Sequence, residues 1–380
     1  MQIGSKQYED RAYQADMAKL DVVIIAFWRG WSSGSQTIRS VVQHIKQLNP
    51  AVLVGQYTVL NEWFDDPNNT SALEPRAKLT AQNWWLRRAD GSKVQWTTQY
   101  NTWEINLTDW TTPDAAGMRY PQWRARYDFT HFFSPVPEFD IWYFDNVMIR
   151  QRIASADWNL DGKDDPGTSP AIQAAFRNGQ TAGWKTAKSL APDRILMGNP
   201  DNDLGSPEFR GRLQGAFLEG LIGQSWSIES WGGWDAMMAR YRTVLKNLQP
   251  PAIVGFHVMG AVKDYRLFRY GYTSCLMEDG YFSYTDSTNV YNSVPWFDEY
   301  DVQLGAAQDA PPQTAWKNGV YRRSFANGLV LLNPTAVART VTLERGWKRI
   351  AGVQAPGWNN GSAVTTLTLQ AKDGIVLVRR

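Results

Sequence analysis

Two carboxylates close predicted β-strands in this sequence, and their positions indicate glycosidase chemistry. Asp145 follows the apolar run 141–144 of the predicted strand 139–147, and Glu219 follows the run 215–218. In a parallel barrel both side chains would lie at the mouth, where such barrels bind their substrates. A glycosidase needs one ionised carboxylate at the anomeric carbon and one protonated acid at the leaving oxygen. Either residue alone could equally cap a helix or join a loop salt bridge, so the interpretation depends on the pair.

Polar and aromatic side chains follow the same predicted strand ends. Asn, Asp, Arg, Gln and His can hydrogen-bond sugar hydroxyls, and aromatic rings form the walls of sugar subsites, although any single tryptophan can instead belong to the core. Competing carboxylates are Glu62, Asp109 and Glu229. The predicted substrate-binding residues are Trp28, Arg29, Trp31, Gln56, Tyr57, Trp63, Asp109, Tyr143, Asn146, Asn199, Asp201, Trp226 and His257.

An acidic segment after the strand that ends at Asp145 has the spacing of a calcium loop. Oxygen side chains at positions one, three and five, with glycine at six, form a loop that wraps a hard cation. The twelfth position is Thr168 and not the usual glutamate, and an acidic turn without an ion is the alternative. We therefore expect a structural Ca²⁺ and no organic cofactor. Its predicted ligands are Asp157, Asn159, Asp161, the Lys163 carbonyl and Asp165, with Asp164 as a substitute for the last.

Composition narrows the class of partner. The 380 residues are 43% hydrophobic and 20% charged, which is typical of a folded protein. A formal charge of +2 gives no support for a nucleic-acid or anionic-membrane partner, and no run reaches the ~20 apolar residues that span a bilayer. The single cysteine, Cys275, excludes an internal disulfide. The 19 Trp, 16 Tyr and 15 Phe suggest a carbohydrate partner, since indole faces stack on sugar rings; a large aromatic core is the alternative.

The hydrophobic pattern predicts an α/β fold, a (β/α)8 TIM barrel over residues 1–310, followed by a small all-β sandwich domain over 311–380. Short apolar runs alternate with amphipathic stretches such as 35–48 and 171–190 in the first part, which is the pattern of such a barrel. After the Pro311-Pro312 pair, short strands are joined by turns that contain Asn-Gly. The eight predicted barrel strands are 21–27, 51–60, 103–107, 139–147, 194–198, 215–219, 252–258 and 280–284.

Together these motifs resemble hypothetical glycosyl hydrolase family 15. The resemblance rests on the excursion 83–96 (NWWLRRADGSKVQW), the Tyr-Phe-Asp-Asn-Val sequence around Asp145, the calcium-type loop, the Leu-Glu-Gly sequence around Glu219, and the C-terminal domain. That family resembles polygalactosaminidase-like barrels and the clan D alpha-galactosidases. The resemblance implies that Asp145 is the nucleophile and Glu219 the acid/base. Clan D has Asp at the second position, so Glu219 departs from its pattern.

We therefore expect a retaining glycoside hydrolase that acts on alpha-linked glycosides of a polysaccharide or oligosaccharide. An inverting mechanism stays open, because the sequence does not give the distance between the two carboxyl groups. A non-catalytic carbohydrate-binding barrel and a transglycosylase that uses the same carboxylates also stay open. We expect secretion or a periplasmic location, with a signal peptide outside this sequence.

Overall fold

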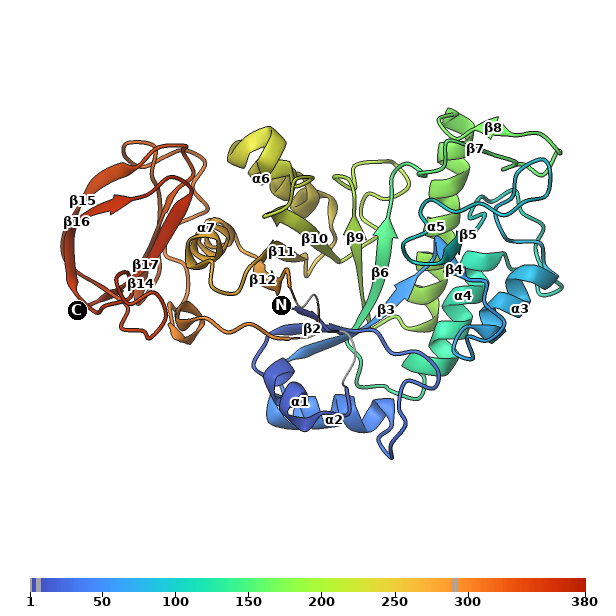
Figure 1. The fold of residues 1–380 in the computed structure, drawn as a ribbon, viewed down its shortest axis with the longest axis horizontal. Helices are drawn as coiled ribbons and strands as arrows, with labels where there is room; N and C mark the ends of the chain where they lie inside the picture. The colour runs from blue at the N-terminus through green and yellow to red at the C-terminus, as the bar shows by residue number, and fades with distance from the viewer. Residues whose placement is uncertain (1, 5–7, 289–290, 292) are drawn as a thin grey trace. The chain divides into compact units, whose positions relative to one another are not determined.

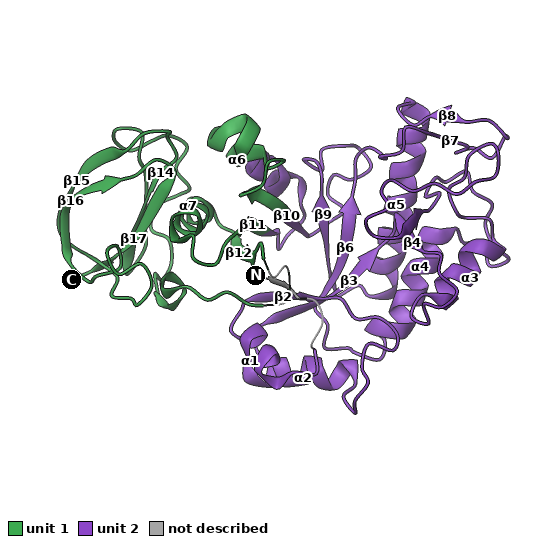
Figure 2. Cartoon of the chain, viewed as in Figure 1, with its two compact units in different colours: residues 1–2, 219–239, 255–380 green, residues 3–218, 240–254 purple. Residues whose placement is uncertain are grey.

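The computed structural model describes residues 2–4, 8–288, 291 and 293–380 (Figure 1). The chain divides into two compact units, which Figure 2 shows in different colours. None of the helices in the described part is long and apolar enough to cross a membrane. Unit 2 contains Ile3–Leu218 and Arg240–Val254, and unit 1 contains Met1–Gln2, Glu219–Ala239 and Gly255–Arg380.

Unit 2 is built on parallel strands whose residues are buried on both faces. The sequence Val-Val-Ile-Ile of β2 is fully buried, as expected for a strand covered by helices. Parallel pairing joins β2 to β3, β3 to β6, β6 to β9 and β9 to β10. Five predicted strands are thereby confirmed: β2 (Val22–Ile25), β3 (Leu53–Val59), β6 (Ile141–Val147), β9 (Ile195–Pro200) and β10 (Gly215–Ile222).

Amphipathic helices connect these strands. In α2 the apolar Val41, Val42 and Ile45 are buried, and Thr37 forms a capping box with Ser40 at its N-terminus. A π-helical turn, Phe129–Phe133, follows α4. The predicted helices 35–48 and 171–190 correspond to α2 and α5. The α-helices that lie wholly in the described part of unit 2 are α1 (Arg11–Ala18), α2 (Ile38–Leu48), α3 (Leu73–Ala81), α4 (Tyr120–Asp128) and α5 (Pro170–Leu190).

One predicted barrel strand is wrong. The segment 103–107 is not in the main sheet: β5 (Thr102–Glu104) pairs antiparallel with β4 (Glu62–Phe64) in a separate two-stranded sheet. The main sheet has no position for this segment between β3 and β6, because these two strands pair directly with each other. The order of the main sheet is β1-β2-β3-β6-β9-β10-β11-β12, with the short β1 (Gln2–Gly4) at one edge. Closure into an eight-stranded barrel is not confirmed.

Unit 1 contains the later parallel strands and the C-terminal sheet. Strand β11 (Ile253–Gly260) pairs parallel with β12 (Tyr281–Asp286), and α7 (Tyr265–Leu276) connects them. Helix α6 (Ile228–Asn247) is interrupted at Gly233, whose φ is +79°. The predicted strands 252–258 and 280–284 are confirmed.

The C-terminal strands form one five-stranded antiparallel sheet in the order β13-β14-β17-β15-β16. Its core contains Leu331, Val341, Leu367 and Ile375. The two facing sheets of the predicted sandwich are not confirmed. A buried ion pair of 3.0 Å joins Arg269 of α7 to Asp373, so this sheet belongs to the same unit as α7. The strands are β13 (Tyr321–Ser324), β14 (Gly328–Asn333), β15 (Arg339–Arg349), β16 (Ala363–Leu369) and β17 (Asp373–Arg379).

Candidate active site

Asp145 lies near the carboxyl end of β6, between donors from both neighbouring strands. The Tyr57 hydroxyl of β3 donates to Asp145 Oδ2 at 2.5 Å, and the Asn199 amide of β9 donates to Asp145 Oδ1 at 3.0 Å. The carboxylate is half-buried. Two hydrogen bonds, one to each oxygen, fix the orientation of the carboxylate. Tyr57, Asn199 and Asp145, all predicted site residues, are thus brought together.

A local irregularity of β6 determines the direction in which the Asp145 side chain points. Phe144 pairs with Gly198, whereas Val147 pairs with Pro200, so β6 has one residue more than β9 across this step. Asn146 within the step has a φ of +52°, a left-handed conformation that asparagine tolerates better than most residues. Such bulges redirect side chains and are frequent beside active sites. The irregularity begins directly at Asp145.

An aromatic cavity of about 340 Å³ lies beside Tyr57 in unit 2. Trp28, Trp63 and Phe64 line it together with Tyr57 and Arg124. The Trp63 indole N–H donates to the Ala72 carbonyl at 3.1 Å, which fixes the ring in place. Because Tyr57 both lines the cavity and binds Asp145, the cavity and the carboxylate form one candidate site. Its size and its largely apolar lining, with several aromatic rings, match those of small-molecule sites.

A buried polar network supports the cavity, and the sequence reasoning missed it. The Arg124 guanidinium lies 4.3 Å from the Trp63 ring centroid and donates to Asp128 at 2.8 Å. Thr58 donates to the other oxygen of Asp128 at 2.8 Å. Burial raises the pKa of Asp128. Burial by itself would lower the pKa of Arg124, but the charges and hydrogen bonds of Asp128 and Tyr120 together outweigh it and raise that pKa. The sequence did contain one signal for this network: Arg124 and Asp128 are four residues apart, a spacing that allows an ion pair on a helix.

Glu219 lies in unit 1, where the second half of β10 continues. The Tyr291 hydroxyl donates to Glu219 Oε1 at 2.5 Å. The next residue, Gly220, has a φ of +58°, and a Cβ there would lie 2.1 Å from the Trp226 ring. The left-handed backbone conformation therefore favours glycine immediately after Glu219, and a larger residue there would also displace the Trp226 ring.

His257 supports the backbone next to Glu219. Its Nδ1 accepts from the Gly220 N–H at 2.9 Å, which puts the ring proton on Nε2, 2.8 Å from the Thr285 hydroxyl. Burial lowers the pKa of His257 to about 3, so the ring is neutral at pH 7. The side chain is fully buried and its role in this structure is to hold Gly220, although the sequence predicted a contact with substrate.

Other predicted substrate-binding residues lie in different environments. Gln56 is buried and braces both backbone groups of Phe27, and the Tyr143 ring is buried against Tyr57. Arg29 forms an ion pair with Glu74, and Trp31 packs edge-on against Phe27. The two exposed aspartates accept hydrogen bonds: Asp109 from Asn178, and Asp201 from the Ile149 N–H and Asn202.

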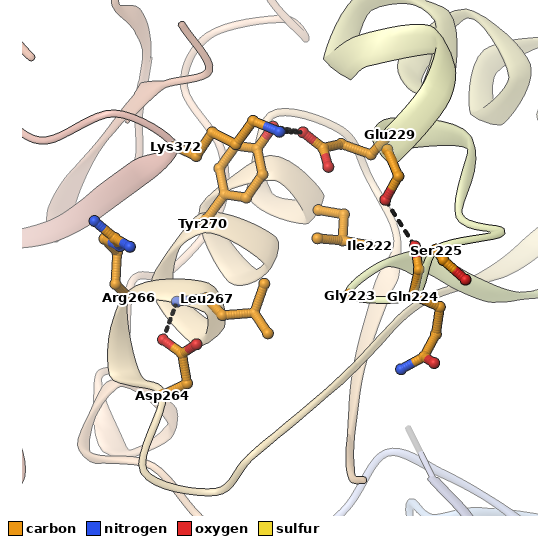
Figure 3. Close-up of a pocket in the computed structure, with 11 residues that line it drawn as sticks. Ile222, Gly223, Gln224, Ser225, Glu229, Asp264, Arg266, Leu267, Tyr270 and Lys372 are labelled. Carbon is orange, nitrogen blue, oxygen red and sulfur yellow. Dashed lines mark hydrogen bonds and ion pairs between the residues drawn. The ribbon is translucent and has the colours of Figure 1, made fainter. Parts of the chain in front are cut away.

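Two of the competing carboxylates are engaged in ion pairs. Glu62 contacts Arg152 at 2.9 Å. Glu229 is buried against Lys372, at 2.6 Å, and accepts from the Tyr270 hydroxyl at 3.0 Å. Figure 3 shows this second group in a cavity of about 410 Å³ in unit 1. Both carboxylates thus have a cationic partner at ion-pair distance, in contrast to Asp145, whose oxygens accept from the neutral donors Tyr57 and Asn199.

The acidic loop 157–165 folds back on its own backbone. Asp157 accepts from the Asp161 and Gly162 N–H groups, each at 3.0 Å, and Asp161 accepts from the Lys163 N–H at 2.9 Å. Gly162 has a φ of +82°, as the sharp turn of a cation-binding loop requires. In the described part of the chain no three His, Cys, Asp or Glu residues are grouped so that they could hold a metal ion. The calcium ligand set therefore stays a prediction.

Comparison with known proteins identifies relatives at the level of family and fold. The profile of hypothetical glycosyl hydrolase family 15 matches residues 46–329. A search of curated proteins finds no match.

Three solved structures are similar in fold. An Anoxybacillus alpha-amylase has a TM-score of 0.50 at 10% identity, over 98% of this chain and 90% of its own. The GH36 alpha-galactosidase AgaA from Geobacillus stearothermophilus, in complex with raffinose, has a TM-score of 0.52 at 9% identity, over 100% of this chain and 55% of its own. A cycloalternan-degrading enzyme from Trueperella pyogenes, in complex with isomaltose, has a TM-score of 0.50 at 12% identity, over 100% of this chain and 61% of its own. The chain thus spans less than two thirds of the length of the alpha-galactosidase and of the cycloalternan-degrading enzyme. At identities this low, the similarity concerns the fold alone.

Proposed function

The chain belongs to hypothetical glycosyl hydrolase family 15, and from this premise we propose that it is a retaining glycoside hydrolase that cleaves alpha-linked glycosides of a polysaccharide or oligosaccharide. The observation that supports this most strongly is the carboxylate of Asp145, oriented by Tyr57 and Asn199 beside an aromatic cavity. An aromatic wall provides a stacking surface for a pyranose, and a fixed carboxylate at its edge provides the nucleophile.

In the proposed first step, an Asp145 carboxylate oxygen attacks the anomeric carbon. The glycosidic C–O bond breaks, and Glu219 transfers its proton to the departing oxygen. In the second step Glu219 takes a proton from water, the water oxygen attacks the anomeric carbon, and the bond to Asp145 breaks. The sugar leaves with its original anomeric configuration, and both carboxyl groups return to their starting protonation states.

Two contacts in unit 1 fix the position of Glu219. Tyr291 donates to one of its oxygens, and neutral His257 holds the adjacent Gly220 N–H. These contacts hold the Glu219 side chain and the backbone beside it in place, which suits a group that must exchange a proton at a fixed position. In clan D, which this family resembles, the acid/base is an aspartate. The role of Glu219 is therefore tested separately from that of Asp145.

The proposal is tested by sugar release from a panel of alpha- and beta-linked polysaccharides. Wild type is expected to release sugar from at least one alpha-linked polymer. Asp145→Asn and Glu219→Gln are expected to lose that activity while keeping the wild-type circular dichroism spectrum. Asp16→Asn, an exposed aspartate that pairs with Lys19 on α1, is the matched control and should retain full activity.

Each competing function gives a different result in the same experiment. Saturable binding of a glycan without product would favour a non-catalytic carbohydrate-binding protein. Longer oligosaccharides formed from an added acceptor would indicate transglycosylation. An inverted anomer in the first-formed product would indicate a water molecule between the two carboxyl groups, and thus an inverting mechanism. Full activity of Asp145→Asn would overturn the assignment of the nucleophile.

We also propose, separately, that the loop 157–165 binds a structural Ca²⁺ and that the protein acts outside the cytoplasm. Support for calcium comes from the one-three-five spacing of Asp157, Asn159 and Asp161 and from the turn at Gly162. The ion would brace the loop that follows β6. Catalysis by Asp145 and Glu219 does not require it.

A further inference from the structure

The aromatic pair Trp96 and Tyr100, called here the aromatic platform, lies outside the candidate active site. Their ring centroids are 5.9 Å apart, and the side chains are 42% and 51% exposed. The surrounding sequence, Gln-Trp-Thr-Thr-Gln-Tyr-Asn over residues 95–101, has no aliphatic residue. The platform is therefore two apolar ring surfaces within a polar, solvent-facing segment.

The Trp96 ring is held in place from two directions. Its indole N–H donates to Glu62 Oε2 at 2.9 Å, and the Arg152 guanidinium lies 4.2 Å from its centroid. Arg152 is fixed in turn by ion pairs to Glu62 at 2.9 Å and to Glu104 at 2.7 Å. A side chain that is already fixed loses little conformational entropy when a ligand binds.

The platform and the aromatic cavity belong to opposite faces of the two-stranded β4–β5 sheet. Neighbouring residues of a strand point to opposite sides. Trp63 lines the cavity and contacts Arg124, whereas the adjacent Glu62 contacts Arg152 and Trp96. The platform is thus a site of its own within unit 2, and it is not an extension of the cavity wall.

We propose that the aromatic platform is a second carbohydrate-binding site, which holds a pyranose of the polymeric substrate away from the reacting bond. A pyranose has an apolar C–H face and a polar rim of hydroxyls. The platform offers the matching arrangement: ring faces for stacking, with the Glu62 carboxylate, the Arg152 guanidinium and amide side chains at its border. A protein partner would need a larger apolar surface than two rings in a polar segment. The choice of ligand rests on the proposed function.

The site is tested by affinity electrophoresis in gels that contain soluble starch, dextran, pullulan or galactomannan. Binding is measured in the Asp145→Asn background, so that the polymer is not consumed. We expect Trp96→Ala to raise the dissociation constant for the retarding polymer about tenfold, which corresponds to about 1.4 kcal/mol. Trp96→Phe keeps a ring but loses the bond to Glu62, so an intermediate value is expected. Trp231→Ala, which removes a side chain that is 71% exposed, is the control and should bind normally.

Activity of Trp96→Ala with Asp145 intact separates this site from the catalytic one. Hydrolysis of a p-nitrophenyl glycoside should be unchanged, because one sugar does not reach the platform, whereas the KM for the polymer should rise. Unchanged polymer binding by Trp96→Ala, or no retardation of the parent protein by any of the four polymers, would overturn the inference. If Trp96→Ala loses binding but no glycosidase activity is found, the platform stands and the proposed function fails.

Discussion

Replacing Glu104 by glutamine should remove a pH dependence from the stability of the protein. Burial raises the pKa of Glu104 from 4.5 to about 7, and the Arg152 charge offsets only part of that effect. The folded protein therefore keeps a proton that the unfolded chain releases between about pH 4.5 and pH 7. The stabilisation is fully present below pH 4.5 and is lost as the pH rises through about 7.

The magnitude follows from the two pKa values. A rise from 4.5 to about 7 corresponds to about 3 kcal/mol at about 1.4 kcal/mol per unit of pKa. Glu104 is only 4% exposed, so little of this is lost to solvent screening. Glutamine resembles the neutral acid and does not titrate. The free energy of unfolding of Glu104→Gln, relative to wild type, should therefore increase by about 3 kcal/mol between pH 4.5 and pH 8.

The assay is urea unfolding followed by tryptophan fluorescence, for wild type and variant, at several pH values across this range. Taking the difference between the two proteins cancels the titration of all other groups. Glu344→Gln is the matched control. A hydrogen bond from Arg322 lowers the pKa of Glu344 to about 2, so this carboxyl is ionised in the folded protein throughout the range. Its difference should be nearly flat once the pH lies above 4.5, the ordinary pKa at which the unfolded chain titrates. An equally flat difference for Glu104→Gln would refute the reasoning, because Glu104 would then be ionised in its ion pair.

Three further predictions concern the site and the acidic loop. Tyr57→Phe removes the donor to Asp145 and should lower kcat/KM about 10- to 100-fold, because a hydrogen bond to a charged group contributes about 1.5–3 kcal/mol; unchanged kinetics would exclude a positioning role. Gly220→Ala should lower both melting temperature and activity, since its Cβ would lie 2.1 Å from Trp226 at a φ of +58°; a wild-type melting temperature would contradict this. EDTA should lower the melting temperature of wild type by a few degrees but not that of Asp161→Ala; equal values for wild type with and without EDTA would count against calcium.

Strands with continuous apolar runs could be predicted from the sequence. The runs that became β2 and β6 are buried on both faces, so their side chains carry the signal directly. The position of Asp145 near the end of β6 followed from the same pattern. Its partners Tyr57 and Asn199 were among the predicted residues because they close or follow neighbouring strands.

The segment 103–107 could not be assigned from its own residues. Its short apolar alternation resembles that of a barrel strand, but Glu104 pairs with Arg152, which lies 48 residues further along the chain. Arg152 also pairs with Glu62, so one distant residue bridges β4 and β5. Arg124 and Asp128 present the same difficulty, since their spacing is typical of an exposed helix pair, whereas Thr58 and Trp63 bury them. Whether the C-terminal strands form one sheet or two facing sheets likewise depends on which strands pair with each other. Local sequence patterns do not encode this pairing.

The proposed mechanism requires a covalent bond between Asp145 and the sugar, and trapping that intermediate is its sharpest test. A 5-fluoroglycosyl fluoride of the sugar identified in the panel would be incubated with wild type, and the labelled protein analysed by intact mass and peptide mapping. We expect one added glycosyl group per chain, on the peptide that contains Asp145. A label on a different carboxylate, or turnover without any label and with an inverted product, would show that Asp145 is not the nucleophile.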